Sequence, residues 1–136
     1  MTAIPAPARS RHLVAGFWLL IAFVLVMASW PRPILIPGNP SDKVQHIAAF
    51  VVLTVAAVLA YRDMPRWRIA LTLSGFGGLI EIVQLIPALH RQSDWADWRA
   101  DTAAIVVTMA VMWLVAWGTR AARPVGRFSW KSFRRG

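Results

Sequence analysis

The chain has 136 residues, enough for one domain, and 57% of them are hydrophobic. With a positive mean hydropathy, this composition excludes an ordinary soluble domain of this size and predicts an integral membrane protein. The 15 Lys and Arg residues outnumber the 6 Asp and Glu residues, for a formal net charge of +9. We expect this charge to meet anionic lipid headgroups and expect no nucleic-acid partner. Cysteine is absent, which excludes disulfides and thiolate metal sites.

Four apolar segments follow one another along the chain: Leu13 to Trp30, Val44 to Tyr61, Ile69 to about Pro87, and Ala100 to Gly118. At about 1.5 Å per residue, each roughly matches a hydrocarbon core about 30 Å thick. The connections are short and contain prolines, glycine or charged residues. The sequence therefore predicts an all-α integral membrane protein, folded as an antiparallel bundle of four transmembrane helices.

Lys and Arg are distributed unevenly over the two sides of this bundle. One side holds eleven, at Arg9, Arg11, Arg62, Arg66, Arg68, Arg120, Arg123, Arg127, Lys131, Arg134 and Arg135. The other side holds four, at Arg32, Lys43, Arg91 and Arg99. Because cytoplasmic loops carry the excess of basic residues, we expect both termini in the cytoplasm and the first and third connections outside.

The first apolar segment permits a second interpretation. Basic residues precede it, and Val26-Met27-Ala28 is a tolerable signal-peptidase pattern. Its length and the Trp30-Pro31 that follows favour an uncleaved helix. We therefore expect a cytoplasmic segment over 1–12, a helical domain over 13–118 and a basic tail over 119–136, with the tail lying against anionic inner-leaflet lipids.

Charged and polar residues gather at the outward ends of the predicted helices. Asp42, Lys43 and His46 open the second helix, and their spacing puts Asp42 or Lys43 on one face with His46. Ser41 is a candidate N-cap, and Asp42 suits the positive end of the helix dipole. Capping alone accounts for Asp42, but it explains less well an imidazole one turn farther into the membrane.

Glu81 and Gln84 lie three residues apart on the third helix, so their side chains share a face and can form a local pair. If this helix continues to about Ile86, Glu81 lies roughly 8 to 12 Å below the outer surface. An ionised carboxylate there costs on the order of 3 kcal/mol unless it is paired or hydrated. Pro87 has no N–H for the carbonyl of Val83, which predicts a free acceptor near Gln84.

Small residues in the second and third helices predict close packing of these two helices, which would bring His46 toward Glu81. They include Gly75, Gly77 and Gly78. The third connection adds His90, Arg91, Asp94, Asp97 and Arg99, and Asp101 follows in the first turn of the last helix. Trp95 and Trp98 fit an interfacial aromatic belt, and Asp97 and Asp101 also suit a helix start. The convergence of three segments nevertheless favours a site at the outward end.

The segments SDKVQHIAAFVVL, GGLIEIVQLIP and RQSDWADWRADTAA together resemble the VanZ-like family of small bacterial membrane proteins. The family pattern is D-K-x-x-H-x-x-x-F, then G-x-x-x-E-x-x-Q, then R followed by D-x-x-x-N. It is matched by Asp42, Lys43, His46, Phe50, Gly77, Glu81, Gln84, Arg91 and Asp97. Asp101 stands where the family usually has Asn, and Ala104 and Val107 stand where it usually has small glycines.

This resemblance covers Ser41 to Val107 and implies a multi-pass protein of the bacterial cytoplasmic (inner) membrane. The family takes its name from a member associated with teicoplanin resistance, so the resemblance also implies a link to the cell envelope and to antibiotic resistance. It implies no reaction. The substitution at Asp101 puts in doubt any role that the family's Asn has.

Three functions are compatible with these residues. The polar cluster binds an amphiphilic envelope ligand, a lipid-linked precursor or a lipoglycopeptide, with Lys43 and Arg91 holding its anionic group. Alternatively, the protein is a small membrane enzyme with His46 as base and Glu81 as acid. A third hypothesis is a structural subunit of an envelope assembly, as a homo-oligomer or with a protein partner. The cluster consists of Asp42, Lys43, His46, Glu81, Gln84, Arg91, Asp97 and Asp101.

The sequence predicts neither a cofactor nor a metal site. Side chains of metal-binding type are present, at His46, Glu81, His90, Asp97 and Asp101. No spacing such as H-E-x-x-H supports a zinc site.

Overall fold

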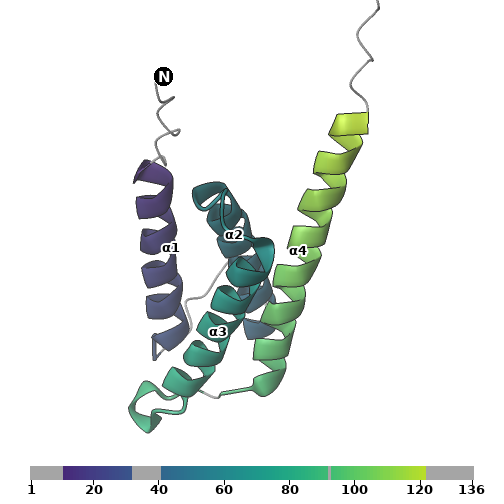
Figure 1. Cartoon of the computed structure of the whole chain (residues 1–136). Coiled ribbons are helices and arrows are strands. Elements are labelled where there is room, and N and C mark those ends of the chain that lie inside the picture. Colours follow the sequence, from purple (N-terminus) through teal and green to yellow (C-terminus); the bar gives the residue numbers. More distant parts are fainter. Residues whose placement is uncertain (1–10, 32–40, 92, 122–136) are drawn as a thin grey trace, which may run out of the picture.

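The computed structural model describes residues 11–31, 41–91 and 93–121. They form α1 (Arg11–Ser29), α2 (Asp42–Ala60), α3 (Arg66–Gln84), the short 3-10 helix η1 (Pro87–Leu89) and α4 (Trp95–Ala121). Consecutive α-helices run in opposite directions, so α2 and α4 begin at the end of the molecule where α1 and α3 finish (Figure 1). This confirms the all-helical fold. The segment 1–10 and the tail from 122 onward lie outside the described residues.

Three of the four α-helices, α1, α2 and α4, are long and apolar enough to cross a membrane. α3 has 19 residues but a less apolar sequence, because arginines open it and Glu81 and Gln84 close it. Large apolar side chains cover the outside of the molecule, including Leu19, Leu71 and Trp113. Such a surface is typical of helices surrounded by lipid.

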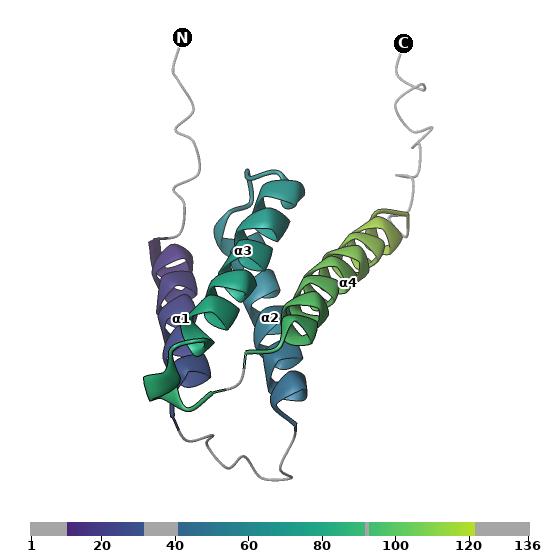
Figure 2. The ribbon, with the colours of Figure 1, turned by 90° about the horizontal axis from the view of Figure 1, so that it is seen from below.

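α4 packs between α2 and α3, and each of these two helices contacts α4 more extensively than it contacts the other. α1 lies against α2 and α3 on the side away from α4 (Figure 2). The apolar core between the helices is built around the fully buried Phe50, Leu53, Leu73, Ile80 and Ile105. The first half of α4 therefore connects α2 and α3 in the middle of the bundle.

The glycines of α3 allow this approach. A Cβ atom at Gly77 would lie 3.3 Å from the Phe50 ring, 3.4 Å from Oδ2 of Asp101 and 3.5 Å from Trp98. At Gly75, by contrast, it would meet nothing within 4 Å. The sequence predicts that these small residues serve contact with α2, and the structure shows that α4 uses them as well, because the Trp98 ring lies against Gly77 and Gly78.

The helix ends agree only in part with the sequence analysis. Ser41 caps α2 as predicted, with its Oγ accepting from the N–H of Val44 at 3.4 Å. α3 ends at Gln84, short of the predicted Pro87, which opens η1 instead. The prediction of a free Val83 carbonyl is wrong, because this oxygen accepts from the N–H of Ile86 at 3.1 Å. The tighter turn at the end of α3 supplies the donor that Pro87 lacks.

Candidate functional site

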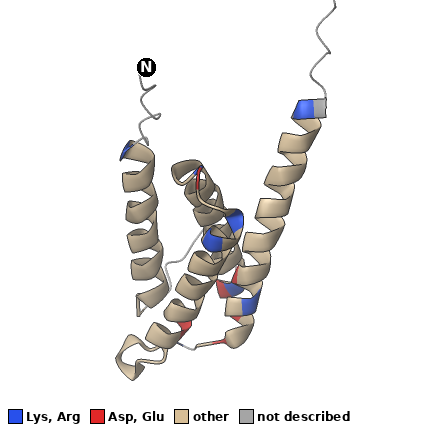
Figure 3. Ribbon diagram, in the orientation of Figure 1, with Lys and Arg blue, Asp and Glu red and all other residues tan. Residues whose placement is uncertain are grey.

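Most of the acidic residues lie toward the end of the bundle where α2 and α4 begin, and Asp63, between α2 and α3, is the exception (Figure 3). Arg11 and Arg120 lie at the opposite end, at the start of α1 and the finish of α4 (Figure 3). Of the eight residues predicted to form the polar cluster, five are buried: His46, Glu81, Gln84, Asp97 and Asp101. Side chains of this kind are costly to bury without partners, so their hydrogen bonds show how the end of the bundle is built.

Two pairs join α2 to α4. Nδ1 of His46 lies 3.3 Å from Oδ2 of Asp101, and both residues are buried. Nζ of Lys43 donates to Oδ1 of Asp97 and lies 3.8 Å from Oδ2 of Asp94. Because α2 and α4 run in the same direction, one turn along α2 matches one turn along α4. Asp97 and Asp101 thus have partners on another helix. The prediction that Asp101 lies in the first turn of the last helix is wrong, because α4 begins at Trp95 and Asp97 is the acid in its first turn.

The start of α4 is capped by a different acid. Oδ1 of Asp94, the residue before the first of α4, accepts from the N–H of Ala96 at 2.8 Å. The carbonyl of Asp94 accepts from the N–H of Asp97 at 2.7 Å. This leaves the carboxylates of Asp97 and Asp101 for the contacts with α2.

Glu81, near the end of α3, binds the segment that leads into α4. Its side chain is 0% exposed, and Oε2 accepts from Oγ of Ser93 at 3.1 Å and from the N–H of Asp94 at 2.7 Å. Oε1 has no hydrogen-bond partner in the part of the chain that the structure describes. Protein atoms, not lipid, therefore surround this carboxylate.

Gln84 turns toward α1. Its Nε2 donates to the carbonyl of Ala28 at 3.0 Å, close to where α1 ends. The predicted local pair between Glu81 and Gln84 is wrong, because each side chain bonds to a different segment. The bonds of Glu81 and of Gln84 both hold the end of α3 to neighbouring segments of the chain.

Arg91 bridges the chain after η1 to the start of α2. Its Nη2 lies 2.9 Å from Oδ1 and 2.7 Å from Oδ2 of Asp42. Asp42 therefore does more than stabilise the helix start. His90, beside Arg91, is exposed, with φ 50° and with Nδ1 3.1 Å from the carbonyl of Ala88.

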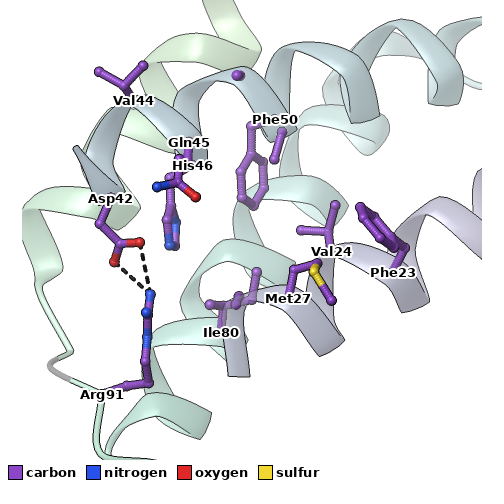
Figure 4. Close-up of a pocket in the computed structure, with 13 residues that line it drawn as sticks. Phe23, Val24, Met27, Asp42, Val44, Gln45, His46, Phe50, Ile80 and Arg91 are labelled. Atoms are coloured by element: carbon purple, nitrogen blue, oxygen red, sulfur yellow. Dashed lines mark hydrogen bonds and ion pairs between the residues drawn. The ribbon is translucent and has the colours of Figure 1, made fainter. Parts of the chain in front are cut away.

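A pocket of about 540 Å³ opens between α1, α2 and α3 (Figure 4). Most of its wall is apolar and includes Phe23, Val24 and Met27 from α1, Ala49 and Phe50 from α2, and Ile80 from α3. Its polar wall is formed by Asp42, Gln45, His46 and Arg91. These four residues lie at the first turns of α2 and after η1, so the pocket is polar at one end and apolar along the rest.

The eight residues of the predicted cluster therefore take two positions. Asp42, His46 and Arg91 line the pocket. Lys43, Glu81, Gln84, Asp97 and Asp101 do not line it and bond to other segments around it. Three side chains of metal-ligating type lie close together here, since one ligand atom each of Asp42, His46 and Asp97 lies within 4.8 Å of the others.

The sequence analysis missed the pocket wall that α1 supplies and missed Ser93 as a partner of Glu81. It also assigned Trp98 to the membrane interface together with Trp95. Trp95 is exposed, but Nε1 of Trp98 donates to the carbonyl of Ser74 at 3.0 Å. One feature of the sequence could have indicated that Trp98 faces α3: it lies one turn before Thr102, a polar residue on the same face of α4. In the structure the hydroxyl of Thr102 bonds to Ser74 at 2.8 Å.

Comparisons with protein-family models, with curated proteins and with solved structures give no match for this chain. The resemblance to the VanZ-like family stays a prediction that rests on the motif residues. The function has to be inferred from the geometry of the site.

Proposed function

We propose that the protein is a VanZ-like, multi-pass protein of the bacterial inner membrane, with four transmembrane helices and both termini in the cytoplasm. The apolar exterior of α1, α2 and α4 supports the membrane location. The basic residues at the end that holds Arg11 and Arg120 support the orientation, since cytoplasmic sides are rich in Lys and Arg. In this orientation the pocket's polar end faces the outer leaflet.

The protein binds an amphiphilic ligand of the cell envelope in this pocket. The observation that carries this proposal is the division of the pocket wall into a long apolar part and one polar end. A hydrocarbon tail fits against Phe23, Val24 and Met27, and a headgroup meets Asp42, His46 and Arg91. Apolar pockets with a few convergent polar groups are the usual form of small-molecule sites.

The candidate ligands are a lipid-linked envelope precursor and a lipoglycopeptide, which would connect the protein to glycopeptide resistance. Both carry a long apolar chain beside a polar headgroup. Arg91 is the cation placed to receive an anionic headgroup, since it lines the pocket, whereas Lys43 donates to Asp97 outside the pocket wall. An incoming anion would exchange with Asp42 for the Arg91 guanidinium.

The test is a binding titration of a fluorescent polyprenyl-linked precursor with the purified full chain in detergent. Ala49→Phe fills the apolar part of the pocket, and Arg91→Gln removes the cation. Each should weaken binding at least tenfold, which corresponds to about 1.4 kcal/mol. Ala110→Phe, the same change at an exposed position of α4, should leave binding unchanged. Equal binding by the wild type and both pocket variants would rule the proposal out.

One pair of residues supports an enzyme as the second candidate. Asp101 bonds to Nδ1 of His46, which leaves Nε2 of a pocket-lining imidazole for a substrate proton. A carboxylate that orients an imidazole in this way is a common feature of general bases. Glu81 does not line the pocket, so its role as an acid has less support. Product formation from a lipid phosphate by the wild type, and its loss in His46→Gln, would establish catalysis.

A further inference from the structure

The polar end of the pocket presents a difficulty for an anionic headgroup. Lys43 and Arg91 are already paired with Asp97 and Asp42. Asp101, which contacts His46, has no Lys or Arg partner among the described residues, so an anion that enters beside His46 is repelled by this carboxylate. A further cation at this place would remove the repulsion.

Three side chains are placed to hold such a cation. Ligand atoms of Asp42, His46 and Asp97 lie within 4.8 Å of one another. Oxygen and nitrogen ligands bind zinc-like ions at about 2.0 to 2.2 Å, so two ligands of one ion lie at most about 4.4 Å apart. Small side-chain rotations would close the remaining gap, and the exposed Asp42 side chain can rotate when it releases Arg91.

The bond between His46 and Asp101 prepares the imidazole for this role. Nδ1 lies 3.3 Å from the Asp101 carboxylate, so Nε2 is the ring nitrogen left for an ion. Histidine ligands usually donate their second N–H to a carboxylate or carbonyl, which fixes the tautomer and the ring orientation.

A separate observation points to a missing positive charge. Asp101 is 0% exposed, and its Oδ1 has no hydrogen-bond partner among the described residues. The other oxygen of this carboxylate, Oδ2, lies 3.3 Å from Nδ1 of His46, so the unpartnered Oδ1 belongs to a residue in direct contact with the cluster. A fully buried oxygen of this kind is unfavourable unless a nearby charge compensates it.

We propose that Asp42, His46 and Asp97 bind one divalent metal ion, with Asp101 as the residue that positions His46. Two carboxylates and an imidazole suit Mn²⁺ or Zn²⁺. Bound there, the ion takes over part of the neutralisation of Asp42 and Asp97, and Arg91 becomes available to a ligand. A bound ion also indicates the class of headgroup, namely a phosphate or pyrophosphate whose oxygens complete the coordination. This inference about the headgroup rests on the proposed function.

The metal site is tested with Mn²⁺, titrated into the purified full chain and followed by electron paramagnetic resonance. The wild type should bind one ion, and Asp42→Asn and Asp97→Asn should each weaken binding at least tenfold. Asp101→Asn should weaken it about 10- to 100-fold, as substitutions behind a ligand do. Asp63→Asn, at an exposed acid between α2 and α3, should have no effect.

Circular dichroism melting identifies variants that fail to fold. Asp42→Asn is the ligand variant expected to fold normally, because Asp42 is exposed. The proposal is overturned if the wild type binds neither Mn²⁺ nor Zn²⁺ at millimolar concentration. It is also overturned if folded Asp42→Asn binds Mn²⁺ as tightly as the wild type does.

A second titration separates this proposal from the proposed function. Polyprenyl phosphate in detergent micelles is added with Mn²⁺ or with EDTA, and we expect binding to need the ion. Equal binding in EDTA would reject the metal-held headgroup and keep the amphiphile site. Binding of Mn²⁺ without any lipid binding would keep the metal site and reject the amphiphile site.

Discussion

The two halves of α4 differ sharply in burial and in polarity. The first half carries the buried residues Asp97, Asp101, Ala104 and Ile105 and packs between α2 and α3. The second half, from Val106 onward, is almost entirely exposed and apolar, with Trp113 65% exposed. With 27 residues and a length of about 40 Å, α4 extends past the helices it packs against. In α4, therefore, polar side chains are buried in the first half and apolar side chains face outward in the second half.

This contrast shows what holds the helices together. In lipid, apolar side chains gain little from leaving the hydrocarbon, so helix contacts depend on close packing and on hydrogen bonds. Both are concentrated around the first half of α4, where Gly77 allows close approach and Asp101 contacts His46. Substitutions there should destabilise the fold, and substitutions in the second half should not.

The largest effect is expected where the first half of α4 packs most closely. Gly77→Leu would drive a side chain into Phe50, Asp101 and Trp98 and should lower the free energy of unfolding by about 3 kcal/mol. Gly75→Leu, two residues away and facing open space, should not destabilise the protein. Thermal melts in detergent, followed by circular dichroism, measure both. Equal losses would show that Gly77 is no more closely packed than Gly75.

Removing the Asp101 carboxylate comes next. Asp101→Leu leaves the buried His46 without its partner and should lower the free energy of unfolding by about 2 kcal/mol. Asp101→Asn keeps an oxygen for the imidazole and should lose less than about 1 kcal/mol. The comparison is made by denaturation with sodium dodecyl sulfate. If both variants lost the same amount, the bond to His46 would contribute nothing to the joint between α2 and α4.

A smaller effect is expected at the contact between α3 and α1. Gln84→Leu removes the bond to the Ala28 carbonyl and should lower the free energy of unfolding by about 1 kcal/mol. Thr72→Leu, on the exposed face of α3, is the matched control and should change it by less than about 0.5 kcal/mol. The same denaturation assay applies. A loss as large as that of Asp101→Leu would mean that α1 is needed for the whole bundle.

The smallest effect is expected in the second half of α4. Leu114→Ala should change the free energy of unfolding by less than about 0.5 kcal/mol, because the side chain is 55% exposed. The oligomeric state in detergent, measured as the molecular mass of the assembled protein, should also stay the same. A loss above about 1 kcal/mol, together with a smaller mass, would show that this half contacts a second copy of the chain.

Much of this architecture follows from local features of the sequence. The lengths of the apolar segments predict the four helices, and Ser41 before Asp42 predicts the start of α2. Apolar runs and caps act over a few residues, so a single segment contains the information. The gathering of acids and His46 at one end follows as well, because alternating helices bring their polar ends together.

The partners within that end were decided by contacts between segments far apart in the chain. Gln84 bonds to Ala28, 56 residues away, and His46 bonds to Asp101, 55 residues away. The pocket and the group formed by Asp42, His46 and Asp97 likewise draw on segments that no spacing rule connects. These pairs depend on which helix faces pack against one another. That choice depends on the shapes of whole helix faces, so only the tertiary structure could make it.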